Sequence, residues 1–135
     1  MISFVVVALV LAAITLAQAK LDKKESIDLI NKCKKETGAT EDAEQLFETQ
    51  VIPETPKGKC LMQCVMREQG LMKENKIDAQ AISQFFEKTY ADDPEQLEKA
   101  AAAVAKCSLI DVKGQDKCDV AVAYLKCGQK NESRL

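Results

Sequence analysis

The 135-residue chain has 19 basic and 21 acidic residues, which gives a formal net charge of −2 at pH 7. Because charges of both signs are mixed along the sequence, the balance gives no electrostatic reason to expect binding to nucleic acid or to an anionic membrane. The chain contains no histidine. This absence removes the commonest general base, the usual partner of a nucleophilic serine or cysteine, and the commonest metal ligand.

Two acidic pairs are the remaining candidates for acid–base chemistry, namely Glu41 with Asp42 and Asp92 with Asp93. Each pair stands at an expected helix start, where acidic side chains cap free amides and suit the positive end of the helix dipole. We therefore assign no catalytic residue, no metal ligand and no cofactor. The sequence indicates a binding protein rather than an enzyme.

The N-terminus has the pattern of a secretory signal peptide over residues 1–19. This segment carries no charged side chain, and its apolar run over residues 4–14 leads to the small-x-small triplet Ala17–Ala19. We expect cleavage after this triplet, which leaves residues 20–135 as one domain. A membrane anchor is the alternative, but the apolar run is shorter than the roughly 20 residues needed to cross a bilayer.

All six cysteines follow the signal peptide: Cys33, Cys60, Cys64, Cys107, Cys118 and Cys127. An even number of cysteines in a secreted chain implies an oxidised framework. Cys60 and Cys64 stand four residues apart in a helical pattern, so their side chains point in parallel, which is poor geometry for a mutual disulfide. Each should therefore join a different segment, and spacing alone leaves the partners open. Two free thiols or half of a metal site are the alternatives, and both require reducing conditions.

Apolar residues at helical spacing predict a first helix over residues 21–36, with Cys33 on its buried face. Gly38 supplies the stop. A second, short helix is expected to begin at Thr40, whose hydroxyl can cap free amides, and to run through Phe47.

Residues 51–58 contain two prolines and a glycine, and we expect an extended loop there. The central helix, which carries the two closely spaced cysteines, follows over residues 59–67 and is closed by Gly70. Residues 71–77 are polar and irregular, so we expect them to form only a connection. No strand pattern occurs in the chain.

Three further helices are expected over residues 79–90, 94–107 and 115–127, and an aspartate directly before each of the first two can act as cap. Residues 128–135 are expected to form a short polar tail. The predicted fold class is all-α, with about six helices.

Apolar and aromatic side chains on these helices could line a cavity. Methionine adapts its shape to a guest, and tyrosine adds a polar tip to an apolar body. Disulfides allow a domain to tolerate a hollow centre, although each of these residues also suits an ordinary core. The candidate ligand-binding residues are Met62, Met66, Met72, Ile82, Phe85, Phe86, Tyr90, Val104, Val122 and Tyr124.

The spacing of the cysteines is the most specific signal in the chain. Starting from Cys33, the gaps between successive cysteines contain 26, 3, 42, 10 and 8 residues. This pattern resembles the six-cysteine signature of the insect odorant-binding proteins, the pheromone and general odorant-binding family. The sequence CKKETG over residues 33–38 and the signal peptide are also similar to that family. The resemblance spans nearly the whole mature chain.

The resemblance implies six helices around an internal apolar cavity, joined by three disulfides. The first cysteine would pair with the third, the second with the fifth and the fourth with the sixth: Cys33–Cys64, Cys60–Cys118 and Cys107–Cys127. This pairing agrees with the expectation that Cys60 and Cys64 join different segments.

By the same resemblance, the protein is a secreted carrier that reversibly binds small hydrophobic ligands, such as odorants or pheromones, and transports them through extracellular fluid such as sensillar lymph. The expected partners are the ligand and a chemosensory receptor, and the expected state is a monomer or a weak homodimer. We expect no nucleic acid partner and no stable membrane association. The alternative is a secreted disulfide-linked helical protein that acts on membranes or on a protein partner.

Two features depart from some members of the family. Without histidine, we expect no histidine-driven release of ligand in acid. Residues 129–134 are too polar to fill an apolar pocket, and Leu135 could at most cover an entrance.

Overall fold

The computed structural model describes residues 22–132, so the predicted signal peptide and Leu135 lie outside the described residues. Within this part of the chain the fold is helical, which confirms the predicted fold class, and none of its helices has the length and apolarity that crossing a membrane requires. The elements are the N-terminal helix (22–37), α2 (Ala43–Thr49), α3 (Pro56–Glu68), β1 (Met72–Lys73), β2 (Lys76–Ile77), α4 (Ala79–Thr89), α5 (Pro94–Cys107) and α6 (Lys117–Glu132).

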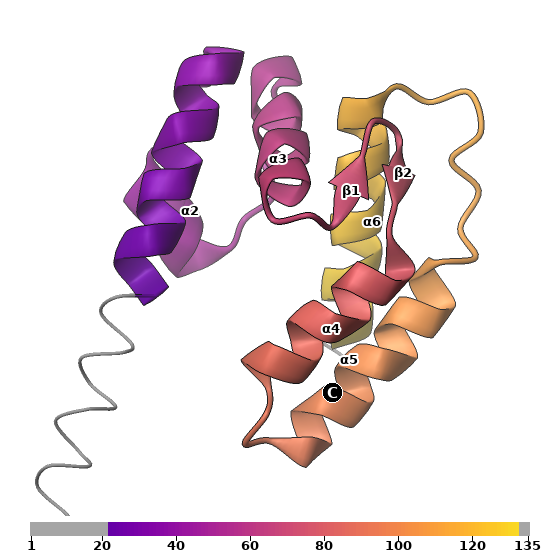
Figure 1. The fold of residues 1–135 in the computed structure, drawn as a ribbon. Helices are drawn as coiled ribbons and strands as arrows, with labels where there is room; N and C mark the ends of the chain where they lie inside the picture. The colour runs from indigo at the N-terminus through magenta and orange to yellow at the C-terminus, as the bar shows by residue number, and fades with distance from the viewer. Residues whose placement is uncertain (1–21, 133–135) are drawn as a thin grey trace, which may run out of the picture.

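The central position in the fold belongs to α3. Figure 1 shows α3 between the N-terminal helix on one side and α6 on the other, with α4 and α5 side by side at one end of α6. The helix α6 packs against both α3 and α5, and α5 packs in turn against α4. Helices from both ends of the sequence therefore meet around α3.

Three disulfides hold this arrangement together. They are Cys33–Cys64, Cys60–Cys118 and Cys107–Cys127, which is the pairing that the family resemblance implies. The helix α3 is thus joined to the N-terminal helix and to α6 from positions one turn apart. No cysteine of the described chain is free.

The starts of α2 and α3 differ from the sequence prediction. The N-cap of α2 is Asp42 and not Thr40, because the Asp42 carboxylate accepts a hydrogen bond from the Gln45 backbone N–H at 2.8 Å. The loop expected to reach residue 58 ends at Thr55, whose hydroxyl accepts from the Gly58 N–H at 3.0 Å. Pro56 then begins α3, since proline is tolerated in a first helical turn.

Both ends of α6 also differ from the prediction. The helix begins at Lys117 and not at Gln115. The side chain of Asp116, directly before it, accepts hydrogen bonds from the backbone N–H groups of Cys118 and Asp119. It continues to Glu132 through part of the predicted tail, so that prediction was wrong for residues 128–132. Gly128 does not stop the helix, because the disulfide of the preceding residue holds this turn against α5.

A short antiparallel hairpin occupies the segment that was expected to form only a connection. Met72 pairs with Ile77 and Lys73 with Lys76, and Glu74 turns the chain with φ of 52°. The Met72 side chain is 2% exposed, and it packs with residues of α3 and α6. Two residues per strand are too few for a period-two pattern, so packing decides this pairing.

Gly58 offers a test of how closely α3 approaches the preceding loop. A Cβ atom added there would lie 2.5 Å from Pro53 Cβ and 2.6 Å from Thr55 Oγ1. We expect Gly58→Ala to lower the free energy of unfolding by about 1 to 3 kcal/mol, the usual cost of overpacking, although alanine is the better helix former. Chemical denaturation of the oxidised protein measures this change.

Gly128→Ala is the matched control, because a Cβ added there meets no described atom within 4 Å. Since Gly128 lies inside α6, we expect this variant to gain up to about 1 kcal/mol of stability. Equal effects of the two substitutions would contradict the close contact at Gly58.

Candidate functional site

One large cavity lies between the helices and has a volume of about 570 Å³. This volume falls within the range of sites that enclose small molecules. Residues of the N-terminal helix, all five later helices and the loop before α3 contribute to its wall. Because the wall combines segments far apart in sequence, the disulfides that join these segments also set its shape.

Eight of the ten candidate ligand-binding residues line this cavity: Met62, Met66, Ile82, Phe85, Phe86, Tyr90, Val104 and Tyr124. The other two, Met72 and Val122, do not line it and belong to the buried core instead. Met72 lies in β1, where it pairs with Ile77 of β2. Val122 stands two residues before Tyr124, so it points to the opposite side of α6.

The aromatic part of the wall comes from α4 and its C-terminal end. The Phe86 and Tyr90 rings stack with centroids 5.9 Å apart, and Phe85 meets Phe86 edge-on at 5.8 Å. Helical spacing brings Phe86 and Tyr90 to the same face, which the sequence pattern had indicated. This face presents rigid apolar surface to the cavity.

Sequence reasoning missed the part of the wall that lies near α2. Leu46 and Phe47 on α2 line the cavity, together with Val51 and Ile52 of the following loop. Val51 is 65% exposed, so the loop places this apolar side chain at the edge of the cavity. The sequence did contain a signal for this part of the wall, because Val51 and Ile52 are adjacent apolar residues in a loop that is otherwise polar or proline-rich.

The polar groups of the wall are few and mostly engaged. The Thr89 hydroxyl donates to the Phe85 carbonyl at 2.8 Å, and the Ser108 hydroxyl donates to the Ala105 carbonyl at 3.0 Å. The hydroxyl of Tyr124 has no hydrogen-bond partner among residues 22–132. It is therefore available to orient a ligand that carries an oxygen atom.

The loop at the edge of the cavity is attached at both ends. The Gln129 side-chain amide of α6 donates to the Gln50 carbonyl at 2.5 Å, and Lys126 pairs with Glu54 at 3.1 Å. The contact of Gln129 depends on the part of α6 that the sequence had assigned to a tail, whereas Lys126 lies within the predicted helix. The extension of α6 thus holds the loop that carries Val51.

Glu41 contacts the same loop at Thr55, where the loop joins α3. Its Oε1 atom accepts a hydrogen bond from the Thr55 hydroxyl at 2.6 Å, and its Oε2 atom is buried with no hydrogen-bond partner among the described residues. The bond from Thr55 lowers the pKa of the Glu41 carboxyl below its usual value, against the opposing effect of burial. The structural role expected for this acidic residue at a helix start therefore extends to the start of α3.

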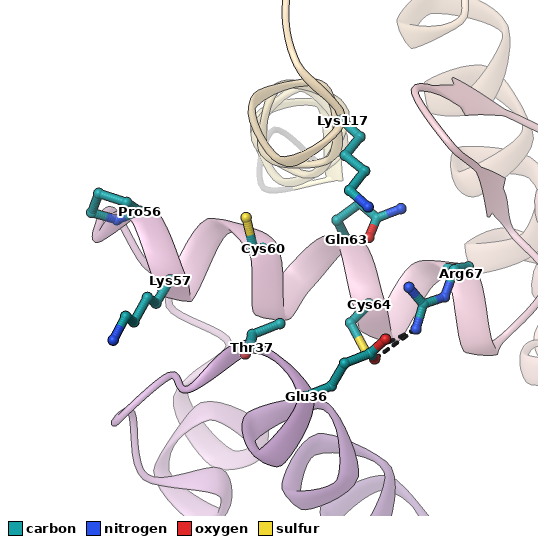
Figure 2. Close-up of a pocket in the computed structure, with 9 residues that line it drawn as sticks. All are labelled: Glu36, Thr37, Pro56, Lys57, Cys60, Gln63, Cys64, Arg67 and Lys117. Atoms are coloured by element: carbon teal, nitrogen blue, oxygen red, sulfur yellow. Dashed lines mark hydrogen bonds and ion pairs between the residues drawn. The ribbon is translucent and has the colours of Figure 1, made fainter.

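A second, smaller hollow of about 400 Å³ lies where the N-terminal helix, α3 and α6 meet (Figure 2). Figure 2 shows Glu36 of the N-terminal helix directed towards Arg67 of α3, and the two side chains form an ion pair at 2.6 Å. Lys57 and Lys117 also line this hollow. Such charged surroundings do not suit an apolar guest.

A possible metal site at the same place has no free thiol. The Glu36 carboxylate lies close to the sulfur atoms of Cys33 and Cys64, but these sulfurs are joined in a disulfide. A metal ion requires thiolates, so the oxidised pair cannot ligate one. The large apolar cavity is therefore the candidate functional site.

Comparison with known proteins agrees with this assignment. The model of the PBP/GOBP family matches residues 17–131. The chain belongs to this family. The resemblance inferred from the cysteine spacing is therefore confirmed. Among relatives in the PBP/GOBP family, general odorant-binding protein 19d of Drosophila melanogaster is 36% identical over 110 residues, which cover 80% of this chain and 72% of that protein.

Solved structures of the PBP/GOBP family have the same fold. Odorant-binding protein OBP28a of Drosophila melanogaster superposes with a TM-score of 0.68 at 30% identity, over 87% of this chain and 94% of that one. The fatty acid binding protein OBP56a from the oral disk of the blowfly Phormia regina gives a TM-score of 0.64 at 25% identity, over 87% and 95% of the two chains.

The depressed pKa of Glu41 predicts an acid-dependent contribution to stability. A folded-state pKa below the unfolded value near 4.5 stabilises the fold above that value, and the contribution is lost as the pH falls through the folded pKa. We expect Glu41→Gln to unfold at a lower denaturant concentration than the wild type at neutral pH, and we expect this difference to shrink in acid. Denaturation midpoints over a pH series measure both effects.

Glu87→Gln, at an exposed position on α4, is the control and should leave the midpoint nearly unchanged. If the difference between wild type and Glu41→Gln stays constant from neutral to strongly acidic pH, the charged form of Glu41 is not what stabilises the loop.

Proposed function

We propose that this protein is a secreted carrier that binds small hydrophobic ligands reversibly in the 570 Å³ cavity and transports them through extracellular fluid. The observation that carries the proposal is the cavity itself, which is lined by apolar side chains from every described helix and by no charged residue of the part of the chain that the structure describes. Membership of the PBP/GOBP family supports the same function. Transport by reversible burial requires no catalytic group.

Affinity in such a site comes mainly from the apolar area that the ligand removes from water, about 25 cal/mol per Å². Part of this gain is offset by the lost freedom of the ligand and of the side chains that close around it. The two methionines of α3 on the wall, Met62 and Met66, can adjust to guests of different shape. We therefore expect binding of a class of ligands rather than of one compound.

The proposed ligand contacts are the eight wall residues that the sequence also indicated: Met62, Met66, Ile82, Phe85, Phe86, Tyr90, Val104 and Tyr124. Long-chain apolar compounds are the class to test first, because the blowfly relative is named a fatty acid binding protein. Under this proposal the protein acts outside the cell, in fluid such as sensillar lymph, and delivers its ligand towards a chemosensory receptor.

A substitution that fills the cavity tests the proposal. Val104 lines the wall, so Val104→Trp should occupy space that a ligand needs and weaken binding of dodecanol about tenfold or more, equivalent to 1.4 kcal/mol. Isothermal titration calorimetry of the oxidised protein measures this affinity, and the wild type should bind with a negative heat-capacity change.

Leu109→Trp is the matched control, because Leu109 is 84% exposed and lies off the cavity wall. It should bind dodecanol like the wild type. The thermal unfolding curves of both variants establish that they are folded. The carrier proposal fails if the wild type binds no apolar compound, and leakage of vesicles under the same conditions would favour action on membranes instead.

A further inference from the structure

The wall of the cavity is electrically neutral. Its polar side chains are glutamine amides and the hydroxyls of Thr89, Ser108, Tyr90 and Tyr124, and among residues 22–132 no Asp, Glu, Lys or Arg lines it. A ligand inside the cavity therefore meets dipoles but no opposite charge.

Two lysines on helices that contribute to the cavity form ion pairs outside its wall. On α6, Lys126 pairs with Glu54 of the loop at 3.1 Å, and on α5, Lys99 pairs with Glu95 at 3.2 Å. Neither lysine is a wall residue. A buried anionic head group would have to forgo its water shell without gaining a cation in exchange.

This lack of a cation separates charged from uncharged ligands. Moving an ionised carboxylate into apolar surroundings without a partner is very unfavourable, and such a group takes up a proton instead. A hydroxyl or carbonyl group loses far less on burial, and one good hydrogen bond offsets much of that loss. The Tyr124 hydroxyl can donate such a bond, and the Thr89 and Ser108 oxygens can still accept one.

We infer that the cavity selects uncharged long-chain ligands with a single oxygen-containing head, such as fatty alcohols, aldehydes or esters, over the ionised fatty acid of the same length. This inference rests on the proposed carrier function and narrows its ligand class. A fatty acid should bind well only in its protonated form.

The experiment compares dodecanol with dodecanoic acid by calorimetry on the oxidised full-length domain. At neutral pH the affinity for the alcohol should be at least about ten times that for the carboxylate. Below about pH 4, where a free carboxyl group becomes protonated, the affinity for the acid should rise towards that for the alcohol. The affinity for dodecanol should change little over the same pH range. The dodecanol titration is therefore the control for any effect of acid on the protein itself.

A cation placed on the rim should reverse the preference. Thr89 lines the cavity and is exposed at the end of α4, so a lysine there can reach a ligand head without burial of its charge. We expect Thr89→Lys to bind dodecanoate about tenfold more tightly than the wild type at neutral pH and to raise the affinity for dodecanoate relative to that for dodecanol. Gln84→Lys adds the same charge to an exposed position of α4 off the wall and should behave like the wild type.

The outcomes separate the two proposals. Equal affinities of the wild type for dodecanol and dodecanoate at neutral pH would overturn the selection of uncharged ligands while leaving the carrier function intact. A gain of dodecanoate affinity in Gln84→Lys equal to that in Thr89→Lys would also overturn it, because net charge and not the wall would then decide. Failure to bind either compound at any pH would instead overturn the carrier function.

Discussion

Cys60 and Cys64 stand one turn apart on α3, and their disulfides join this helix to α6 and to the N-terminal helix. The rest of the fold depends on this double attachment. The two bridges span sequence separations of 58 and 31 residues, and in the chain-entropy model each stabilises the fold by about 4 kcal/mol. Since the net stability of a domain is only about 5–15 kcal/mol, these two bonds are a large part of what keeps the helices together.

The bridges also explain how the domain keeps a cavity of about 570 Å³. Side chains that face an empty volume lose dispersion contacts, so a hollow interior weakens an ordinary core. A disulfide acts mainly on the unfolded chain, and it therefore offsets this loss without filling the space. The third bridge, Cys107–Cys127, serves the same purpose at the wall itself, because Cys107 lines the cavity.

The edge of the cavity is formed by a loop that is held in place by contacts with other segments. The loop before α3 is held by the hydrogen bond of Thr55 to Glu41 and by the amide of Gln129 on α6. An exposed apolar side chain, Val51, sits between these two attachments. Among the described residues the wall beyond this edge carries no charge, which is the basis of the proposed preference for uncharged ligands.

The sequence by itself determined the features that depend on neighbouring residues or on cysteine count and spacing. These are the helical period, the caps Asp78 and Asp93, and the family whose disulfide pairing the structure contains. Only the tertiary structure decided where α6 ends, that Met72 pairs in a hairpin, and that Val51 faces the cavity. Each of these depends on contacts between segments far apart in the chain, and the free energy of such contacts does not appear in any local pattern.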